Sequence, residues 1–551
     1  MSMICVPIMV EEPQSALLDA SLAQAKGADL VEFRVDLLFE QHDEESLDDR
    51  MDRVLDLVKE SPLPCIVTCR PHWEGGDYHG DDDERISLYE ALGTSDHPPA
   101  YIDVELATYT RSANIRQKVN LAVDHPKQQR KVTTRLILSS HDFEGRPSDL
   151  TRKIIAMNDE PACAVVKIAY RARSIRDNLE LFEILRDRQK PMIALCMGEF
   201  GLMSRVLAPK FGGLLTFATL RSEETTAPGQ PTIDELLNLY RFRSITPTTK
   251  VYGIIGYPVT QSMSPLVHNA GFEKIGRDGV YVPMPVEGSY ESFKATMLAM
   301  IDSDLHFAGA SVTIPHKEHM HQLYSAESES ELWWADETVE LCGSSNTFSR
   351  SLVYGETDVY EYALFNTDVT AILSLLGGIE SQFSGTSVSI YGSGGVARAA
   401  AFSLCARGAD IDLRYRSAQP AERIAEDLQS LQGSITTAKL SDAPNTSACT
   451  YINCTPVGMT GGPDPDGLSI PIPDMPPLPP ETVFFDTVYN PIETPMLKAA
   501  KERGYRTIDG VQMFVKQAEA QFELWTGQAA PDGLFDSLVR SKLSATPENQ
   551  S

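Results

Sequence analysis

Short apolar segments recur along the first half of the chain, and each is rich in Val and Ile. Between most of them lie longer stretches in which apolar residues follow helical spacing, such as residues 86–92 and 178–186. Eight nearly continuous apolar strands that alternate with helices are typical of a parallel sheet closed into a (β/α)8 TIM barrel. The eight predicted strands are residues 4–10, 30–35, 65–69, 102–106, 136–140, 164–169, 193–196 and 214–218.

The pattern changes after this region. Residues 243–249 lose the periodicity and contain Ser, Thr and Pro, which predicts a linker. A new α/β unit begins at Val251. A further apolar strand, residues 387–391, leads into a glycine cluster and an Ala-rich helix, and residues 511–525 are again helical. We therefore expect two more sets of α/β elements after the barrel.

The chain length agrees with this domain organisation, and the net charge excludes one class of binding partner. With 551 residues, roughly 150 per domain and a barrel larger than average, three domains are the expected number. The chain has 77 Asp and Glu against 48 Lys and Arg, a formal charge of −29. Such a surface repels phosphate backbones, so we expect no nucleic-acid partner, and local basic residues must hold any anionic substrate. The acidic runs 81–84 and 327–331 are expected to be solvated loops.

The remaining global features predict a cytoplasmic protein. The N-terminal residues lack the basic region and cleavage site of a secretory signal. No stretch approaches the roughly 18 uninterrupted apolar residues of a membrane span. The nine cysteines are scattered and include no C-x-x-C. Cys65 and Cys69 lie four apart on one predicted strand, where buried thiols are favoured over a disulfide.

Lys167 stands out because it lies at the end of a predicted central strand, where a charged side chain is costly to desolvate. Its head group either reaches solvent or has a pKa lowered by burial and neighbouring cations, ready to attack a carbonyl. His141 ends the preceding strand and Glu105 the one before it. Together they supply a nucleophile, a proton shuttle and an orienting carboxylate. The polar residues at predicted strand ends are Glu32, Arg34, Arg70, Glu105, His141 and Lys167.

Six motifs over about the first 240 residues resemble the type I 3-dehydroquinate dehydratases. The resemblance implies that Lys167 forms an imine with a substrate ketone. His141 then removes the neighbouring proton and protonates the departing hydroxyl, while Glu105 holds the His141 ring. The motifs are Glu32-Phe-Arg34-Val-Asp36, Asp103-Val-Glu105, Ser140-His141-Asp142-Phe143, Val166-Lys167, Met203-Ser204-Arg205 and Ala227-Pro228-Gly229-Gln230.

The same resemblance assigns the substrate contacts of the barrel. Arg205 is expected to bind the substrate carboxylate. Thr226 stands where the family usually has serine. Because threonine keeps the hydroxyl but stiffens χ1, we expect retained function with altered packing or affinity. The residues expected to contact the substrate hydroxyls or shape the site are Glu32, Arg34, Arg70 and Gln230.

The glycine cluster Gly392-x-Gly394-Gly395 follows a predicted strand and opens a helix, as dinucleotide binding requires. Such a cluster is a weak signal by itself. The next strand, residues 411–416, ends in Arg414-Tyr-Arg416-Ser417. Arginine at this place suits the 2′-phosphate of NADP, whereas Asp412 is interpreted as structural.

A second chemical site is predicted around Lys317. His316, His319 and His321 suggest a metal site, but on a helix residues 316 and 321 point about 140° apart. No other ligand cluster supports them, so we expect no metal. Lys317 is better explained as a proton donor paired with a carboxylate.

This half resembles the shikimate dehydrogenases over about residues 250–545. The resemblance implies that Lys317 and Asp368 are the proton-transfer pair in the reduction of 3-dehydroshikimate by NADPH. The motifs are Ser262-Met-Ser264-Pro265, Val312-Thr313-Ile-Pro-His-Lys317, Ser345-Asn346-Thr347, Asn366-Thr-Asp368, the glycine loop, Asn453-Cys-Thr455-Pro-Val-Gly-Met459, Asp486-Thr-Val-Tyr489-Asn-Pro491 and Gly510-Val-Gln-Met513 with Gln517.

Further site residues follow from this resemblance. Ser262 and Ser264 would hold the substrate carboxylate. Departures from the family pattern are Gln261 in place of histidine, residues 342–345 (Cys-Gly-Ser-Ser) in place of Gly-Ala-Val, and Pro420 near the place of a second basic residue. The last departure leaves the strength of the NADP preference open. The expected ring contacts are Thr313, Asn346, Tyr489 and Gln517, and the expected cofactor contacts are Gly392, Gly394, Gly395, Arg414, Arg416, Ser417, Asn453, Thr455 and Gly510.

Together the two resemblances predict a bifunctional shikimate-pathway enzyme whose small-molecule partners are 3-dehydroquinate, 3-dehydroshikimate and shikimate, with no membrane partner. The expected domains are the dehydratase barrel (1–243), the substrate domain (250–367), the Rossmann-like NADP domain (368–500) and C-terminal helices that return to the substrate domain (501–545). The oligomeric state stays open.

Four other functions are alternatives to this prediction. The second half could act on quinate, and the chain could be a non-catalytic sensor like the fungal quinate repressor. A class I aldolase also uses a barrel lysine, but the arginines fit a carboxylated ring better. No G-x-x-x-x-G-K motif supports a P-loop kinase. The residues that favour catalysis over sensing are Lys167, His141, Glu105, Lys317 and Asp368.

Overall fold

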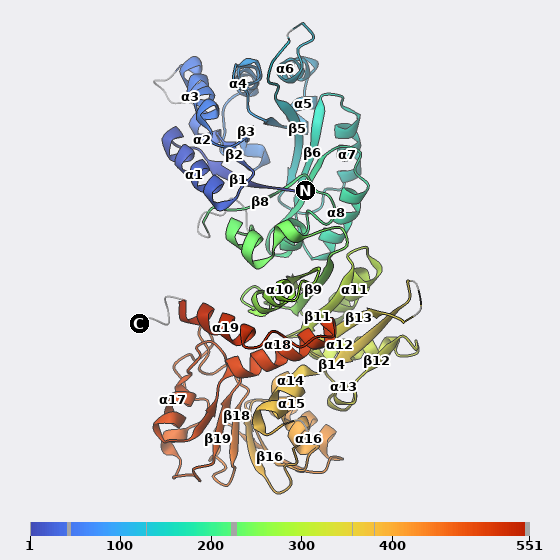
Figure 1. Cartoon of the computed structure of the whole chain (residues 1–551), viewed down its shortest axis with the longest axis vertical. Helices are drawn as coiled ribbons and strands as arrows, with labels where there is room; N and C mark the ends of the chain where they lie inside the picture. Colours follow the sequence, from blue (N-terminus) through green and yellow to red (C-terminus); the bar gives the residue numbers. More distant parts are fainter. Residues whose placement is uncertain are drawn as a thin grey trace. The chain divides into compact units, whose positions relative to one another are not determined.

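The computed structural model of the chain (Figure 1) describes residues 2–40, 46–127, 129–221, 229–354, 356, 358–378 and 381–545. The chain divides into two compact units. The first comprises residues 1–249 with 299–306, and the second comprises residues 250–298 with 307–551. None of the described helices is long and apolar enough to cross a membrane.

The first unit is built on an eight-stranded parallel sheet with the strand order β7-β6-β5-β4-β3-β2-β1-β8. The edge strands come together where the N–H of Leu214 donates to the carbonyl of Met192 over 2.8 Å. The predicted TIM barrel and all eight of its strands are confirmed. The strands are β1 (Met3–Met9), β2 (Leu30–Arg34), β3 (Cys65–Thr68), β4 (Tyr101–Glu105), β5 (Arg135–Asp142), β6 (Cys163–Arg171), β7 (Met192–Met197) and β8 (Leu215–Phe217).

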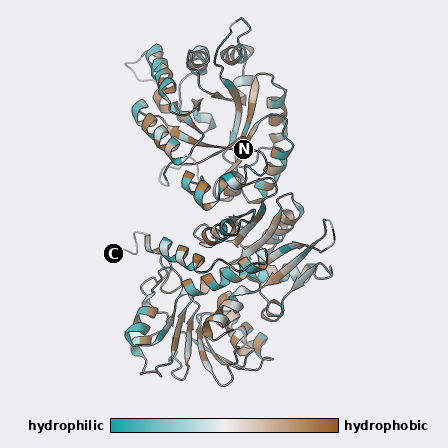
Figure 2. Cartoon of the chain, in the orientation of Figure 1, coloured by the Kyte–Doolittle hydropathy of each residue, from teal (hydrophilic) through white to brown (hydrophobic). Residues whose placement is uncertain are grey.

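Helices follow the strands along the chain. The strands supply an apolar interior, seen as brown residues along the barrel strands in Figure 2. The helices are α1 (Pro13–Lys26), α2 (Asp36–Phe39), α3 (Leu47–Glu60), α4 (Asp82–Thr94), α5 (Leu106–Thr110), α6 (Ala113–Val123), α7 (Leu150–Asp159), α8 (Arg176–Arg186) and α9 (Leu202–Val206), with short 3-10 turns η1 (His72–Glu74) and η2 (Glu199–Gly201).

One predicted loop is helical instead. The acidic run 81–84 forms the cap and first turn of α4, where the side chain of Asp81 accepts a hydrogen bond from the N–H of Asp83. Carboxylates are stabilising at this end because the first N–H groups of a helix have no partners within it. The prediction of a solvated loop at residues 81–84 was therefore wrong.

The second unit contains two six-stranded sheets. The first sheet has the order β10-β9-β11-β13-β14-β12 and is mixed, because β13 runs antiparallel to β11 and β14. Its strands are β9 (Lys250–Gly256), β10 (Gly279–Pro285), β11 (Phe307–Val312), β12 (Trp333–Ala335), β13 (Thr347–Leu352) and β14 (Tyr360–Phe365). Its helices are α10 (Ser264–Lys274), α11 (Tyr290–Asp302), α12 (Lys317–Glu327) and α13 (Glu337–Cys342).

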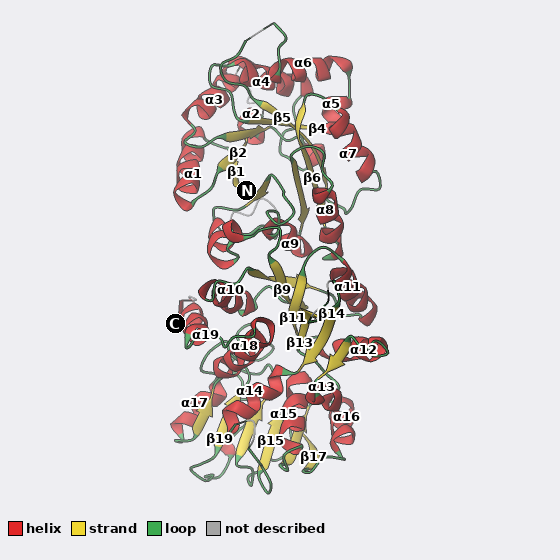
Figure 3. Cartoon of the chain, turned by 45° about the vertical axis from the view of Figure 1, so that its right-hand side comes forward, coloured by secondary structure: helices red, strands yellow, loops and turns green. Residues whose placement is uncertain are grey.

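The second sheet of this unit is parallel, with the order β17-β16-β15-β18-β19-β20. Its strands β19, β15 and β17 are labelled in Figure 3. Numbered from β15, this is the 3-2-1-4-5-6 order of a Rossmann fold. Its edge strand β20 lies beyond residue 500, where the sequence placed the end of the NADP domain. The strands are β15 (Ser387–Tyr391), β16 (Asp410–Tyr415), β17 (Ser434–Lys439), β18 (Thr450–Asn453), β19 (Val483–Asp486) and β20 (Arg506–Ile508), and the helices are α14 (Thr367–Leu376), α15 (Gly395–Cys405), α16 (Ala418–Leu428) and α17 (Pro495–Glu502).

The last two helices, α18 (Gly510–Thr526) and α19 (Leu534–Ala545), join the core of the first mixed sheet. Val511, Phe522 and Phe535 are buried there together with Tyr252 of β9 and Phe272 of α10. The chain thus leaves the Rossmann sheet at β20 and contributes α18 to the core beside β9.

Candidate active sites

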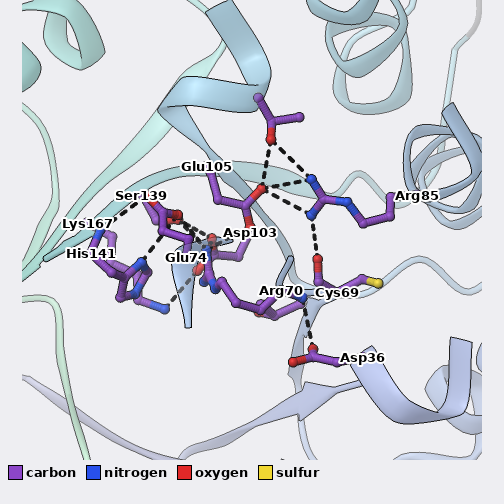
Figure 4. Close-up of polar contacts among 12 residues, drawn as sticks. Asp36, Cys69, Arg70, Glu74, Arg85, Asp103, Glu105, Ser139, His141 and Lys167 are labelled. Atoms are coloured by element: carbon purple, nitrogen blue, oxygen red, sulfur yellow. Dashed lines mark hydrogen bonds and ion pairs between the residues drawn. The ribbon is translucent and has the colours of Figure 1, made fainter. Parts of the chain in front are cut away.

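Lys167 lies on β6 inside the barrel and is only 4% exposed. Its ammonium Nζ lies 2.7 Å from Oδ2 of Asp103 (Figure 4). It also lies 3.3 Å from Oε1 of Glu32 and 4.9 Å from the centroid of the Phe217 ring. The head group therefore does not reach solvent. Its direct polar partners are carboxylates, whereas the sequence predicted neighbouring cations.

Asp103, on β4, connects Lys167 to a guanidinium. One of its oxygens lies 3.1 Å from Nη2 of Arg70 and accepts a hydrogen bond from Oγ of Ser139 over 2.6 Å. Burial alone would raise the pKa of Asp103, but Arg70 and Lys167 outweigh burial and hold that pKa well below its usual range. Asp103 is thus an anion that holds the amine of Lys167 in place.

In the part of the chain that the structure describes, Glu105 bonds guanidinium groups and not the His141 ring, so its orienting role stays a prediction. Oε1 of Glu105 accepts from Nη1 of Arg70 over 2.8 Å, and Oε2 accepts from both terminal nitrogens of Arg85 at 3.1 Å (Figure 4). Thr108 donates to the same Oε2 over 3.1 Å. Alternate strand residues share a face, so Glu105 points inward as Asp103 does, but two buried guanidinium groups occupy it.

The carboxyl group beside the His141 ring belongs to Glu74, at the end of η1. Its Oε2 lies 3.6 Å from Nδ1 of His141, and its Oε1 accepts from the backbone N–H of His141 over 3.4 Å. Burial and the cations Arg70 and Lys167 lower the pKa of His141 well below its usual value. Burial raises the pKa of Glu74 to about 8. A neutral imidazole at neutral pH suits a proton acceptor.

Sequence reasoning missed Glu74 because it considered residues at strand ends. Glu74 lies six residues after β3 and four after Arg70, in a turn before α4. The available signal was a second acidic residue close behind Arg70 on the face where the strands end.

Arg205, on α9, is 2% exposed, and its Nε has no hydrogen-bond partner in the part of the chain that the structure describes. Burial lowers its pKa to about 10. A buried guanidinium without an anionic partner is costly, so this position fits an anionic ligand. Gln230 is also buried, and Arg34 instead forms a two-bond pair with Asp36. Thr226 lies outside the described residues.

The second unit contains a cavity of about 210 Å³ between its mixed sheet and its Rossmann sheet. Most of the residues predicted to bind substrate are in its wall. Ser311, Thr487 and Gln521 line it as well and were not predicted. Ser311 shares a strand face with Thr313, and Gln521 follows Gln517 by one helical turn, so periodicity could have found both. The predicted residues in the wall are Ser262, Ser264, Thr313, Lys317, Asp368, Tyr489, Gly510 and Gln517.

Lys317 and Asp368 form the predicted pair in this wall. Nζ of Lys317, the first residue of α12, lies 2.5 Å from Oδ2 of Asp368, in the first turn of α14. Asp368 is 2% exposed. A protonated amine and a buried carboxylate in contact at a cavity wall can exchange a proton with a bound ligand.

Asn346 is buried behind this wall. Its Oδ1 accepts from the N–H of Thr367 over 2.8 Å and from Oγ1 of Thr347 over 2.8 Å. It therefore ties β13 to the start of α14, and direct contact with a substrate ring stays a prediction.

The glycine loop has the shape that a pyrophosphate requires. Gly392 has φ of 119°, and a Cβ there would lie 2.8 Å from the carbonyl oxygen of Cys454. At Gly394 no atom lies within 4 Å of a Cβ position, so the space in front of α15 is open. Asn453 accepts from both the N–H and the hydroxyl of Thr455, which orders the neighbouring loop. These residues fit a dinucleotide.

The two arginines that were predicted to bind the cofactor, Arg414 in β16 and Arg416 after it, differ in burial. Arg414 is buried and donates to Asp412 over 2.7 Å and to the carbonyl of Ala443 over 2.8 Å. Its guanidinium is therefore paired within the fold, and its contact with the cofactor stays a prediction. Arg416 and Ser417 follow the strand and are exposed, so they remain available to a 2′-phosphate.

The histidines before and within α12 contact one another. Nδ1 of His316 and Nδ1 of His319 are 2.9 Å apart, and Nε2 of His316 lies 2.8 Å from the carbonyl oxygen of Val286. Among the described residues, no group of three or more His, Cys, Asp or Glu side chains could hold a metal ion.

These two sites define a two-site α/β enzyme, with a buried lysine in a barrel and a lysine–aspartate pair beside a Rossmann sheet. Family models match both units: type I 3-dehydroquinase over residues 4–247, shikimate dehydrogenase substrate binding domain over 254–347, and shikimate 5′-dehydrogenase C-terminal domain over 510–536.

Similar proteins cover the whole chain or its second unit. The chloroplastic bifunctional 3-dehydroquinate dehydratase/shikimate dehydrogenase of Arabidopsis thaliana is 36% identical over 97% of this chain and 83% of that protein. A shikimate dehydrogenase (NADP(+)) of Methanocella arvoryzae is 33% identical over 53% of this chain and 99% of that protein. The solved dehydroquinate dehydratase and shikimate dehydrogenase from S. pombe is 24% identical, covers 98% of this chain and 97% of its own, and has a TM-score of 0.40.

The chain therefore belongs to the family of bifunctional 3-dehydroquinate dehydratase/shikimate dehydrogenases. Its barrel is the lyase, and its second unit is the NADP-dependent oxidoreductase of the shikimate pathway.

Proposed function

We propose that the two activities depend on two buried lysine–carboxylate contacts: Lys167 with Asp103 in the barrel, and Lys317 with Asp368 in the second unit. The observation that carries this proposal is that both ammonium groups face carboxylates inside the fold at 2.7 and 2.5 Å. One lysine attacks a ketone, and the other donates a proton.

In the barrel, Lys167 loses a proton and adds to the ketone of 3-dehydroquinate, and loss of water gives an imine. The imine acidifies the neighbouring C–H bond. His141 removes that proton and returns one to the departing hydroxyl, and Glu74 holds the imidazole. Arg205 pairs with the substrate carboxylate, and hydrolysis of the imine releases 3-dehydroshikimate.

Asp103 supports the first step by its position. Its contacts with Arg70 and Ser139 fix the carboxylate, and the carboxylate in turn fixes the amine. Glu32 adds a second oxygen at 3.3 Å from the amine and accepts a hydrogen bond from Thr68 over 2.7 Å. The amine is therefore held in one orientation before the ketone arrives, which reduces the entropic cost of attack.

In the second unit, Lys317 protonates the alkoxide that forms when the ketone of 3-dehydroshikimate is reduced, and Asp368 holds the lysine. Bound NADPH supplies the hydride. Ser262 and Ser264, at the start of α10, bind the carboxylate. The residues proposed to position the ring are Thr313, Tyr489 and Gln517, and those proposed to hold the cofactor are Gly392, Gly394, Gly395, Arg416, Ser417, Thr455 and Gly510.

We also propose the domain limits 1–243, 250–367, 368–508 and 510–545, with the third extended to include β20. Cytoplasmic location and the lack of a nucleic-acid partner remain proposals from charge and sequence pattern. Quinate is the alternative substrate of the second unit, and kinetics with shikimate and quinate side by side decide between them.

Reciprocal substitution tests the assignment. Lys167→Ala should abolish dehydration and leave reduction unchanged, and Lys317→Ala should do the reverse. Because each unit serves as the folding control for the other, a loss of one activity alone reports on that site. Wild-type activity of a variant in its own reaction would contradict the role given to that lysine.

A further inference from the structure

The loop between α13 and β13, residues 342–346, is buried and polar. Ser344, Ser345 and Asn346 are all 0% exposed. We call these residues the serine loop.

The serine loop contacts the backbone beside both members of the proton-transfer pair. The N–H of Ser345 donates to the carbonyl oxygen of Lys317 over 2.9 Å. The carbonyl oxygen of Ser344 accepts from Nδ2 of Asn366 over 3.1 Å. Asn366 immediately precedes α14, whose first turn carries Asp368. A shift of the loop would therefore change the separation of the lysine and the aspartate.

On the Rossmann side of the unit, Arg398 hydrogen-bonds this loop. Arg398 lies in the first turns of α15, the helix that follows the glycine loop. Its Nε donates to the carbonyl oxygen of Cys342, and its Nη2 lies 2.5 Å from Oδ2 of Asp427 on α16. The side chain is 16% exposed.

The approach of the guanidinium requires the glycine of the loop. Gly343 has φ of 62°, and a Cβ on it would lie 3.2 Å from Nη2 of Arg398. Hydrogen bonds from a guanidinium to a carbonyl are stronger than neutral ones. Both Arg398 and Gly343 therefore contribute to the contact between α15 and the serine loop.

We propose that Arg398 is a positioning residue of the reduction, which connects the dinucleotide-binding helix to the Lys317–Asp368 pair through the serine loop. The inference rests on the proposed role of that pair. It predicts that loss of Arg398 slows the chemical step more than it weakens cofactor binding, because the contact reaches the proton donor and not the glycine loop.

The test measures kcat and KM of the reduction for Arg398→Ala, Arg398→Lys and Asp427→Asn in the full chain, with NADPH affinity from fluorescence titration. For Arg398→Ala we expect kcat to fall about tenfold, which corresponds to about 1.4 kcal/mol, with the KM for NADPH changed less than about twofold. Arg398→Lys should recover part of kcat. Asp427→Asn is the matched control, because it removes the contact with α16 and leaves the bond to the loop, so kcat should stay near wild type.

The other outcomes overturn the proposal. An unchanged kcat in Arg398→Ala, a loss found entirely in the KM for NADPH, or an equal loss in Asp427→Asn would each show that Arg398 serves the fold or the cofactor. Dehydratase activity and an NADPH titration confirm that the variants are folded. Lys317→Ala distinguishes a failure of this inference from a failure of the proposed function. If Lys317→Ala lacks reduction while Arg398→Ala reduces normally, only the inference about Arg398 fails. If Lys317→Ala reduces at the wild-type rate, the proposed function itself is refuted.

Discussion

Replacing Glu74 by glutamine tests which carboxylate serves His141. The carboxyl of Glu74 lies 3.6 Å from Nδ1 of the ring, and it is the partner placed to stabilise the imidazolium that forms when His141 takes the substrate proton. A hydrogen bond to a charged group contributes about 1.5–3 kcal/mol. If that interaction is made only after proton transfer, its loss lowers kcat for dehydration about 10- to 150-fold with little change in KM.

Glu105→Gln is the matched comparison, because the sequence assigned the same role to Glu105. It removes the charge between Arg70 and Arg85. Arg70 still contacts Asp103 and Arg85 still contacts Asp82, but losing one partner of a buried ion pair costs about 3–5 kcal/mol. At roughly 2–4 °C per kcal/mol for a domain of this size, the melting temperature of the barrel should fall by about 6–20 °C.

The assay pairs dehydration kinetics, followed by the absorbance of the conjugated product, with scanning calorimetry of both variants. Glu74→Gln should have a lower kcat and an unchanged melting temperature. Glu105→Gln should have a lower melting temperature. The opposite result, normal turnover in Glu74→Gln and lost turnover in a fully stable Glu105→Gln, would refute the placement of Glu74.

Three further predictions follow from the sites. Burial and nearby cations lower the pKa of His141, and the imidazole must be neutral to accept a proton. In Glu74→Gln, where the raised pKa of Glu74 no longer contributes, the remaining kcat/KM for dehydration should therefore decline only below about pH 6.5; an acid limb centred above pH 7 in that variant contradicts this. Arg205→Met should raise the KM for 3-dehydroquinate about tenfold or more. The melting temperature should stay equal or rise, because the substitution removes a buried guanidinium whose Nε has no hydrogen-bond partner among the described residues. An unchanged KM would exclude a contact between Arg205 and the substrate carboxylate. Arg416→Gln should raise the KM for NADPH about tenfold and leave the KM for NADH unchanged. Arg414→Gln should mainly lower the stability of the fold, because Arg414 is bonded to Asp412. The reverse pattern would identify Arg414 as the ligand of the 2′-phosphate.

Strand positions could be predicted from the sequence because a parallel sheet buried on both faces needs continuous apolar segments. All eight barrel strands lie where the pattern indicates, and Lys167 is conspicuous as a charged residue on one of them. The helical start of α4 was missed because an acidic run was interpreted by its solubility and not by its preference for a helix N-terminus.

Side-chain partners were harder to predict than positions. The position of Glu105 at the end of a strand predicts that its side chain faces the barrel interior. The sequence pattern does not predict which of several inward-facing groups it contacts. Arg70 and Arg85 compete for it, and a turn residue, Glu74, reaches His141 instead. Arg414 illustrates the same limit, because Asp412 on the same strand face binds it.

The central claim is that Lys167 forms a covalent imine while Lys317 only transfers a proton. Borohydride reduction in the presence of 3-dehydroquinate, read by intact mass and peptide mapping, tests it most directly. The account predicts one substrate-sized adduct per chain, located on Lys167 and absent without substrate. No adduct, or an adduct on Lys317 or on any other lysine in its place, would contradict it.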